Sequence, residues 1–195
     1  IYIECHGVRK YVSIKKGGAK LVHGETLETF IKFLRENGVS EKTLKVIVFI
    51  HYGDGTFNGT GKVRYDFFTL QSRYAEIIKE ANKELNSNVD LLMKFTERVL
   101  SLGLGNGETY IDYLYCGDEE YGEVISLEKI KRYIKASYRK WNFYQRLHLG
   151  PFLFGPHARY VNTEVKNEKH RHSINVEWPK LRIDVEYLAK RYGGH

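Results

Sequence analysis

The segment "KTLKVIVFIHYGDGTFNG" (residues 42–59) decides how the chain is interpreted, because an apolar run ends there in Gly-Asp-Gly. Ser40 precedes the run and is a favoured helix N-cap residue. The β-branched residues 46–48 also suit a buried strand, but the length of the run and its cap favour a helix. Asp54 then stands at the end of that helix.

A second apolar segment, "NGETYIDYLYCGDEEYGE" (residues 106–123), ends in a similar way. Without gaps, its Gly117 and Asp118 align with Gly53 and Asp54 of the first segment. Aliphatic and aromatic positions before the Gly-Asp pair also correspond. The alignment indicates one module written twice, with a carboxylate at the end of each copy.

The residues between and after these segments predict alternating strands and helices. Residues 56–70 predict a hairpin, because apolar and polar side chains alternate along its second strand, residues 62–67, and Ser72 caps a helix after it. The repeat is partial, because a helix stands where the first copy should have its second hairpin. The β-rich opening of the chain can supply that hairpin if the order of the elements is permuted. We therefore expect an α+β protein, a single domain over residues 1–195, with helix-plus-antiparallel-sheet halves at about 1–103 and 104–195.

An apolar helix that ends in a small residue, Asp and Gly, followed by two strands and a helix, resembles the LAGLIDADG homing endonucleases. "IHYGDGTFNG" (residues 50–59) is the better match, and "YIDYLYCGDEE" (residues 110–120) is a degenerate second one. The resemblance implies two such helices side by side at a pseudo-two-fold axis, with antiparallel sheets forming a saddle on DNA. The family usually has small residues where this chain has Phe49 and Tyr113, because the paired helices approach closely there.

The same resemblance implies a chemistry. Asp54 and Asp118 would bind Mg²⁺ between the two DNA strands, and Glu119 replaces Asp118 if the register is shifted by one residue. Two apposed carboxylates hold hard cations that activate water and stabilise the leaving oxygen of a phosphodiester. The resemblance thus implies a site-specific, metal-dependent endonuclease.

The charge of the chain favours a polyanionic partner, since the formal net charge is +7. Residues 127–150 are especially basic and also rich in aromatic side chains, which suits a nucleic-acid surface and equally suits a solvated helix face. We expect double-stranded DNA as the partner. The candidate phosphate contacts, on or beside predicted strands, are Lys62, Arg64, Arg159, Lys166, Lys169 and Arg171.

Several alternatives stay open at this point. The Gly-Asp pairs also suit ordinary turns after buried segments, with no metal. The protein is then a non-catalytic nucleic-acid-binding protein, such as a replication, viral or accessory factor, or a basic protein in which these turns have no function. His170 and His172 flank Arg171 in an arrangement that partly fits the HUH nickases, which also require a nucleophilic tyrosine.

Composition limits the remaining possibilities for membrane insertion, disulfides and cofactors. No apolar run approaches the roughly 20 residues that span a bilayer, so we expect an intracellular, cytoplasmic protein without a membrane partner. The two cysteines are too few for a disulfide scaffold, and the histidines lack zinc-ligand spacing with them. Nothing in the sequence points to a small-molecule cofactor, and we expect a monomer.

Overall fold

Two four-stranded sheets organise the chain, which the computed structural model describes over residues 1–61, 63–101, 110–143, 146–157, 160–161, 164–165 and 168–192. The α+β class is confirmed. The first sheet has the order β1 (Tyr2–Cys5), β2 (Val8–Lys16), β4 (Tyr113–Gly117), β5 (Gly122–Ser126). The second has the order β3 (Leu21–Thr26), β10 (Ser173–Glu177), β7 (Phe152–Pro156), β6 (His148–Leu149), and a separate pair consists of β8 (Tyr160–Val161) and β9 (Glu164–Val165).

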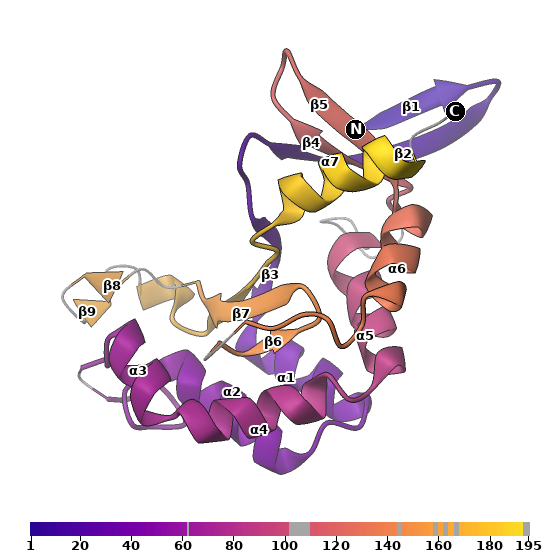
Figure 1. Cartoon of the computed structure of the whole chain (residues 1–195). Coiled ribbons are helices and arrows are strands. Elements are labelled where there is room, and N and C mark those ends of the chain that lie inside the picture. The colour runs from indigo at the N-terminus through magenta and orange to yellow at the C-terminus, as the bar shows by residue number, and fades with distance from the viewer. Residues whose placement is uncertain are drawn as a thin grey trace.

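The helices lie around these sheets, with α7 across the first sheet and α1, α2 and α4 beneath the second (Figure 1). Within the described residues, none of them has the length and apolar character that crossing a bilayer requires. Their bounds are α1 (Leu27–Glu36), α2 (Glu41–Tyr52), α3 (Phe67–Arg73), α4 (Ala75–Leu85), α5 (Val89–Thr96), the π-helix η1 (Glu97–Ser101), α6 (Leu127–Ala136), the 3-10 helix η2 (Glu168–His170) and α7 (Leu181–Tyr192).

The N-terminus of α2 shows why a helix forms over the decisive segment. Ser40 Oγ accepts a hydrogen bond from Thr43 N at 3.3 Å, as its cap position predicts. The carboxylate of Glu84, on α4, accepts from Ser40 N, Ser40 Oγ and Thr43 Oγ1 at 2.6 to 2.7 Å. The cap of α2 is therefore bonded to α4, and Gly53 ends the helix in the left-handed conformation with φ of 59°.

A cluster of aromatic rings holds α1 and α5 to the second sheet. Phe30 of α1 and Phe95 of α5 are fully buried, and their ring centroids lie 5.8 Å apart in an edge-to-face arrangement. Phe152 and Phe154 of β7 each lie 5.6 Å from Phe95, and Trp178 after β10 lies 5.6 Å from Phe152. These edge-to-face contacts fix how the helices pack on the sheet.

The prediction that a second helix pairs with α2 is wrong, because the residues that lead to Asp118 form strand β4. Leu114 and Cys116 are buried while Tyr113 and Tyr115 are only partly buried, a period of two that belongs to a strand. Tyr113 pairs with neighbouring strands, and Phe49 instead packs on the rings of Phe57 and Tyr74. The two positions do not meet at a pseudo-two-fold axis.

The expected hairpin over residues 56–70 is also wrong. Residues 53–61 and 63–66 form neither strand nor helix, and α3 begins at Phe67. Asp66 caps α3, since its Oδ1 accepts a hydrogen bond from Thr69 N at 3.0 Å. This cap outweighs the short alternation of apolar residues that predicted a strand.

The structure contains a different internal repeat, in which β2, β3 and α1 correspond to β4, β5 and α6. Thr26 and Ser126 cap the two helices, and each accepts a hydrogen bond from the backbone N–H three residues on. The apolar positions of α1 and α6 also correspond, with Leu27 matching Leu127. The copies differ in placement, because β3 joins the second sheet whereas β5 stays in the first.

Candidate nucleic-acid interface

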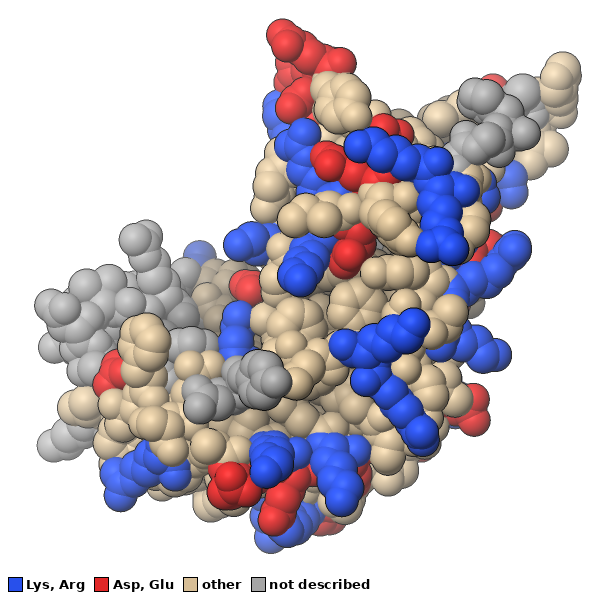
Figure 2. Space-filling view, in the orientation of Figure 1, with Lys and Arg blue, Asp and Glu red and all other residues tan. Residues whose placement is uncertain are grey.

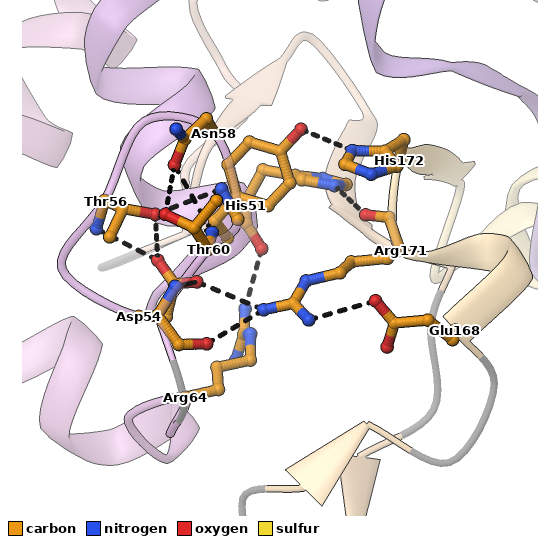
Figure 3. A network of polar contacts seen from close by, with 12 residues as sticks. His51, Asp54, Thr56, Asn58, Thr60, Arg64, Glu168, Arg171 and His172 are labelled. Carbon is orange, nitrogen blue, oxygen red and sulfur yellow. Dashed lines mark hydrogen bonds and ion pairs between the residues drawn. The ribbon is translucent and has the colours of Figure 1, made fainter.

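Asp54 lies in the loop after α2 and is bonded to its own chain (Figure 3). Its Oδ1 accepts hydrogen bonds from the N–H and the hydroxyl of Thr56 at 2.9 and 2.7 Å, and its Oδ2 accepts from Gly61 N at 3.0 Å. Arg171 Nη2 lies 3.4 Å from Oδ2, and the Asp54 side chain is only 3% exposed. Burial alone raises the pKa of this carboxyl, but the bonds from Thr56, Gly61 and Arg171 outweigh it, so the pKa lies below its usual value.

Arg171 and Arg64, both expected to contact phosphate, hold the same region together. Arg171 donates to Gly61 O at 2.9 Å and pairs with Glu168 at 3.0 Å, and its side chain is 18% exposed. Arg64 Nη2 donates to the carbonyls of Ile50 and His51 at 3.3 Å, which satisfies the C-terminal end of α2. Both guanidinium groups thus have partners inside the protein.

Asp118 and Glu119 lie in the turn between β4 and β5. Asp118 Oδ1 accepts from the N–H groups of Glu120 and Tyr121 at 3.1 and 2.8 Å, and these bonds lower the pKa of its carboxyl. Glu119 pairs with Lys16 at 2.7 Å. The β4–β5 hairpin and the loop after α2 lie at opposite ends of the view in Figure 1, so the structure does not bring Asp54 and Asp118 together.

The predicted Mg²⁺ pair does not fit this geometry. Both oxygens of Asp54 already accept hydrogen bonds from the chain, and Asp118 stands in a separate turn. Within the described residues, no group of three or more His, Cys, Asp or Glu side chains is placed to hold a metal ion. Both Gly-Asp pairs therefore act as turn residues in this structure.

Of the other four predicted phosphate contacts, the structure describes only one. Lys62, Arg159 and Lys166 lie outside the described residues. Lys169 is exposed on η2. Of the six residues that the sequence nominated, Lys169 alone is described as an exposed cation.

The positive charge of the molecule gathers on α6 and α7, together with the residues that follow α6. Residues 127–143 and 180–192 contain ten Lys or Arg and three Asp or Glu, a net charge of +7, which equals that of the whole chain. Lys and Arg side chains stand out over these helices in Figure 2. We call this the α6–α7 surface. Its exposed cations are Arg132, Lys135, Arg139, Lys140, Lys180, Lys190 and Arg191.

These seven exposed cations differ from the remaining basic residues of the same segments. Lys131 pairs with Glu97 and Glu128, and Arg182 pairs with Glu186. In the part of the chain that the structure describes, none of the seven forms an ion pair with a carboxylate. Their charges are therefore available to an anionic partner.

Tyrosines lie among these cations. Arg191 stacks over the rings of Tyr187 and Tyr192 at 5.8 and 5.5 Å, and Arg139 stacks over Tyr138 at 4.9 Å. Tyr187 and Tyr192 are both about half exposed, at 47% and 49%. Guanidinium groups on aromatic rings form flat surfaces on which nucleic-acid bases can stack.

Contacts between the two helices make this one surface. Tyr133 of α6 and Tyr187 of α7 have ring centroids 6.5 Å apart. The Tyr133 hydroxyl lies 3.4 Å from Asp184 Oδ1, and Asp184 Oδ2 accepts from the indole N–H of Trp178 at 2.7 Å. Because Trp178 is fully buried, these bonds tie the surface to the core.

Comparison with protein-family models and with curated protein sequences gives no match to this chain. The assignment of an interface therefore depends on the residues and their geometry. The sequence did contain a signal, since residues 127–150 combine cations and aromatic side chains. The contribution of α7 could not be seen there, because only the fold brings it beside α6.

Proposed function

We propose that the protein binds nucleic acid through the α6–α7 surface and does not cut it. The observation that carries the proposal is the concentration of the whole net charge, +7, in two adjacent helical segments. Lysine and arginine side chains that neutralise phosphates release condensed counterions, which is a large part of the free energy of nucleic-acid binding. Double-stranded DNA, with its high density of phosphates, is the first ligand to test.

The geometry favours binding over cleavage. Hydrolysis by paired carboxylates needs two of them at one phosphodiester, together with a metal ion. Asp54 is 3% exposed and bonded to Arg171 in the loop after α2, whereas Asp118 lies in the turn between β4 and β5 of the first sheet. The non-catalytic alternative of the sequence analysis is therefore the one that we propose.

The proposal predicts that removing charge from this surface weakens DNA binding. In the variant Lys135→Gln/Arg139→Gln/Lys140→Gln, three exposed cations become neutral while the side chains keep much of their length. We expect roughly tenfold weaker binding or more, because phosphate contacts and their counterion release are lost. Fluorescence anisotropy with a labelled duplex measures the change.

A second triple variant, Lys32→Gln/Lys79→Gln/Lys83→Gln, provides the matched control. It removes the same charge from exposed positions on α1 and α4, which lie away from α6 and α7 (Figure 1). We expect it to bind nearly as tightly as the wild type. Equal weakening by both triple variants would mean that net charge alone, and not this surface, controls binding.

The same proteins should leave supercoiled plasmid intact in the presence of Mg²⁺. Nicking by the wild type that is lost on replacing Asp54 or Asp118 by Asn would instead support the endonuclease that the family resemblance implies. Binding without nicking is the result that we expect.

A further inference from the structure

A cavity of about 550 Å³ opens between the two sheets, on the side of the first sheet that faces β3 and β10. Its described lining comes from β2, β3, η1, β4 and the segment before it, η2, β10 and the residue after β7. A volume of this size accommodates a small organic molecule, and a junction between two packed units is a common place for such sites.

Lys15 supplies a cation to this cavity. It lies on β2 beside Ser13, on the face that also carries Leu114 of the neighbouring strand. Burial lowers the pKa of its ammonium group. The ammonium group donates one long hydrogen bond, of 3.5 Å, to Val22 O. Among the described residues, no carboxylate pairs with it. A partly buried ammonium group without a carboxylate is stabilised when an anion binds beside it.

Asn175 supplies an unpaired acceptor. Its Oδ1 is buried and has no hydrogen-bond partner among the described residues. It lies on β10 opposite Gly24 of β3, where an added Cβ would approach this oxygen to 3.4 Å. A buried acceptor of this kind costs free energy until a donor reaches it.

The carboxylate in the cavity does not oppose an anion. Glu25 is 9% exposed, and Arg98 binds both of its oxygens, with a distance of 3.1 Å for the Nε contact. His23 Nε2 also lies 3.3 Å from Glu25 Oε1. Because Arg98 compensates the charge of Glu25, Lys15 is left as the uncompensated charge of the described lining.

The rest of the described lining is largely apolar. Val99 and Leu100 of η1, with Leu114 of β4, are buried and contribute aliphatic surface. The imidazole rings of His157 and His170 stack at 4.1 Å and add a flat wall. These surfaces suit a planar or aliphatic body.

We propose that this cavity binds a small organic anion, a phosphate monoester or a carboxylate, that also carries an N–H or O–H donor. The anionic group lies against Lys15, the donor reaches Asn175 Oδ1, and the apolar body contacts η1 and the stacked histidines. This site is separate from the α6–α7 surface and does not depend on nucleic-acid binding.

Thermal unfolding with two matched probe pairs tests the proposal. One pair is adenosine 5′-monophosphate and adenosine, and the other is 4-hydroxybenzoate and phenol, so that phosphate and carboxylate sources are distinguished. We expect at least one anion to raise the Tm of the wild type by several degrees while its neutral counterpart does not, because ligands that bind only the folded state stabilise it.

Two variants and a control locate the binding. Lys15→Met removes the cation and Asn175→Leu removes the acceptor, and each should lose most of the Tm shift. Lys16→Met is the control, because that neighbouring lysine points to the other face of β2 and pairs with Glu119. If a variant unfolds too easily, equilibrium dialysis of the anions below its unfolding temperature replaces the melt.

The outcomes are decisive in either direction. A shift that requires Lys15 and persists in Lys16→Met supports the site and identifies its anionic group. The assignment is overturned if no anion stabilises the wild type, if neutral and anionic probes act alike, or if Lys15→Met and Lys16→Met respond equally.

Discussion

Replacing Asp54 by Ala is expected to lower the free energy of unfolding by about 3 kcal/mol, because the change removes a buried hydrogen-bond acceptor and one of the two carboxylates that pair with Arg171. The change leaves Arg171, which is 18% exposed, without this carboxylate, and it removes the acceptor of Thr56 and Gly61. The loop after α2 loses the bond that holds it to Arg171, which lies in the turn between η2 and β10. Urea denaturation followed by circular dichroism measures the loss.

A double-mutant cycle separates this pair from its surroundings. Arg171→Met alone should also destabilise the protein, and the double variant with Asp54→Ala should cost less than the sum of the two single changes, because both changes remove the same interaction. Asp118→Ala serves as the comparison, since that carboxylate is exposed in its turn. A loss below about 1 kcal/mol for Asp54→Ala would contradict an organising role for this carboxylate.

Acid is expected to destabilise the protein through His51, by an amount on the order of 3 kcal/mol. Burial lowers the pKa of His51 from 6.5 to about 4, against the effect of the hydrogen bond to Arg171 O, and the Arg64 and His172 charges add to the decrease. The unfolded chain therefore takes up a proton at a higher pH than the folded protein does. Stability attributable to this ring is present above pH 6.5, falls as the pH is lowered, and reaches its minimum below about pH 4.

The variant His51→Gln tests this linkage. A glutamine side chain keeps an N–H that can reach Arg171 O, which lies 3.0 Å from His51 Nε2, but it does not titrate. The free energy of unfolding, measured by urea denaturation across this pH range, should fall less steeply for the variant than for the wild type. The same change at exposed His6, in the turn between β1 and β2, provides the comparison. An unchanged acid dependence in His51→Gln would show that another group is responsible.

Sequence patterns predicted the helices of this fold better than its loops and pairings. The cap at Ser40 and the helix that follows it are confirmed, because they depend on neighbours within one turn. The prediction of a hairpin after Asp54 is wrong. Asp66 is the N-cap of α3, and Asp54 bonds to Arg171, which lies far along the chain. Such a long-range bond leaves no periodic signal in the chain.

The duplication illustrates the same limit. Matching Gly53 and Asp54 with Gly117 and Asp118 paired a helix end with a strand end, although both pairs terminate apolar runs. The correspondence between α1 and α6, with a hydroxyl cap before each, was present in the sequence and would have given the better alignment. Short apolar runs can form either a helix or a strand, whereas a capped amphipathic helix is more specific.

The candidate interface was predictable only in part. The basic character of residues 127–150 could be read directly, but Arg64 and Arg171 were expected at the surface and instead bond inside the protein. Arginine side chains often satisfy backbone carbonyls and carboxylates, and sequence alone does not distinguish that use from phosphate binding. The arrangement of α7 beside α6 required the fold.

The dependence of DNA affinity on salt tests the α6–α7 surface most directly. Each phosphate contact contributes about −0.9 to the slope of log K against log salt on double-stranded DNA. The slope of the variant Lys135→Gln/Arg139→Gln/Lys140→Gln should therefore be shallower than that of the wild type by roughly 2 to 3, while the control variant Lys32→Gln/Lys79→Gln/Lys83→Gln keeps the wild-type slope. A salt-independent affinity, or the same slope for both triple variants, would contradict the assignment of nucleic-acid binding to this surface.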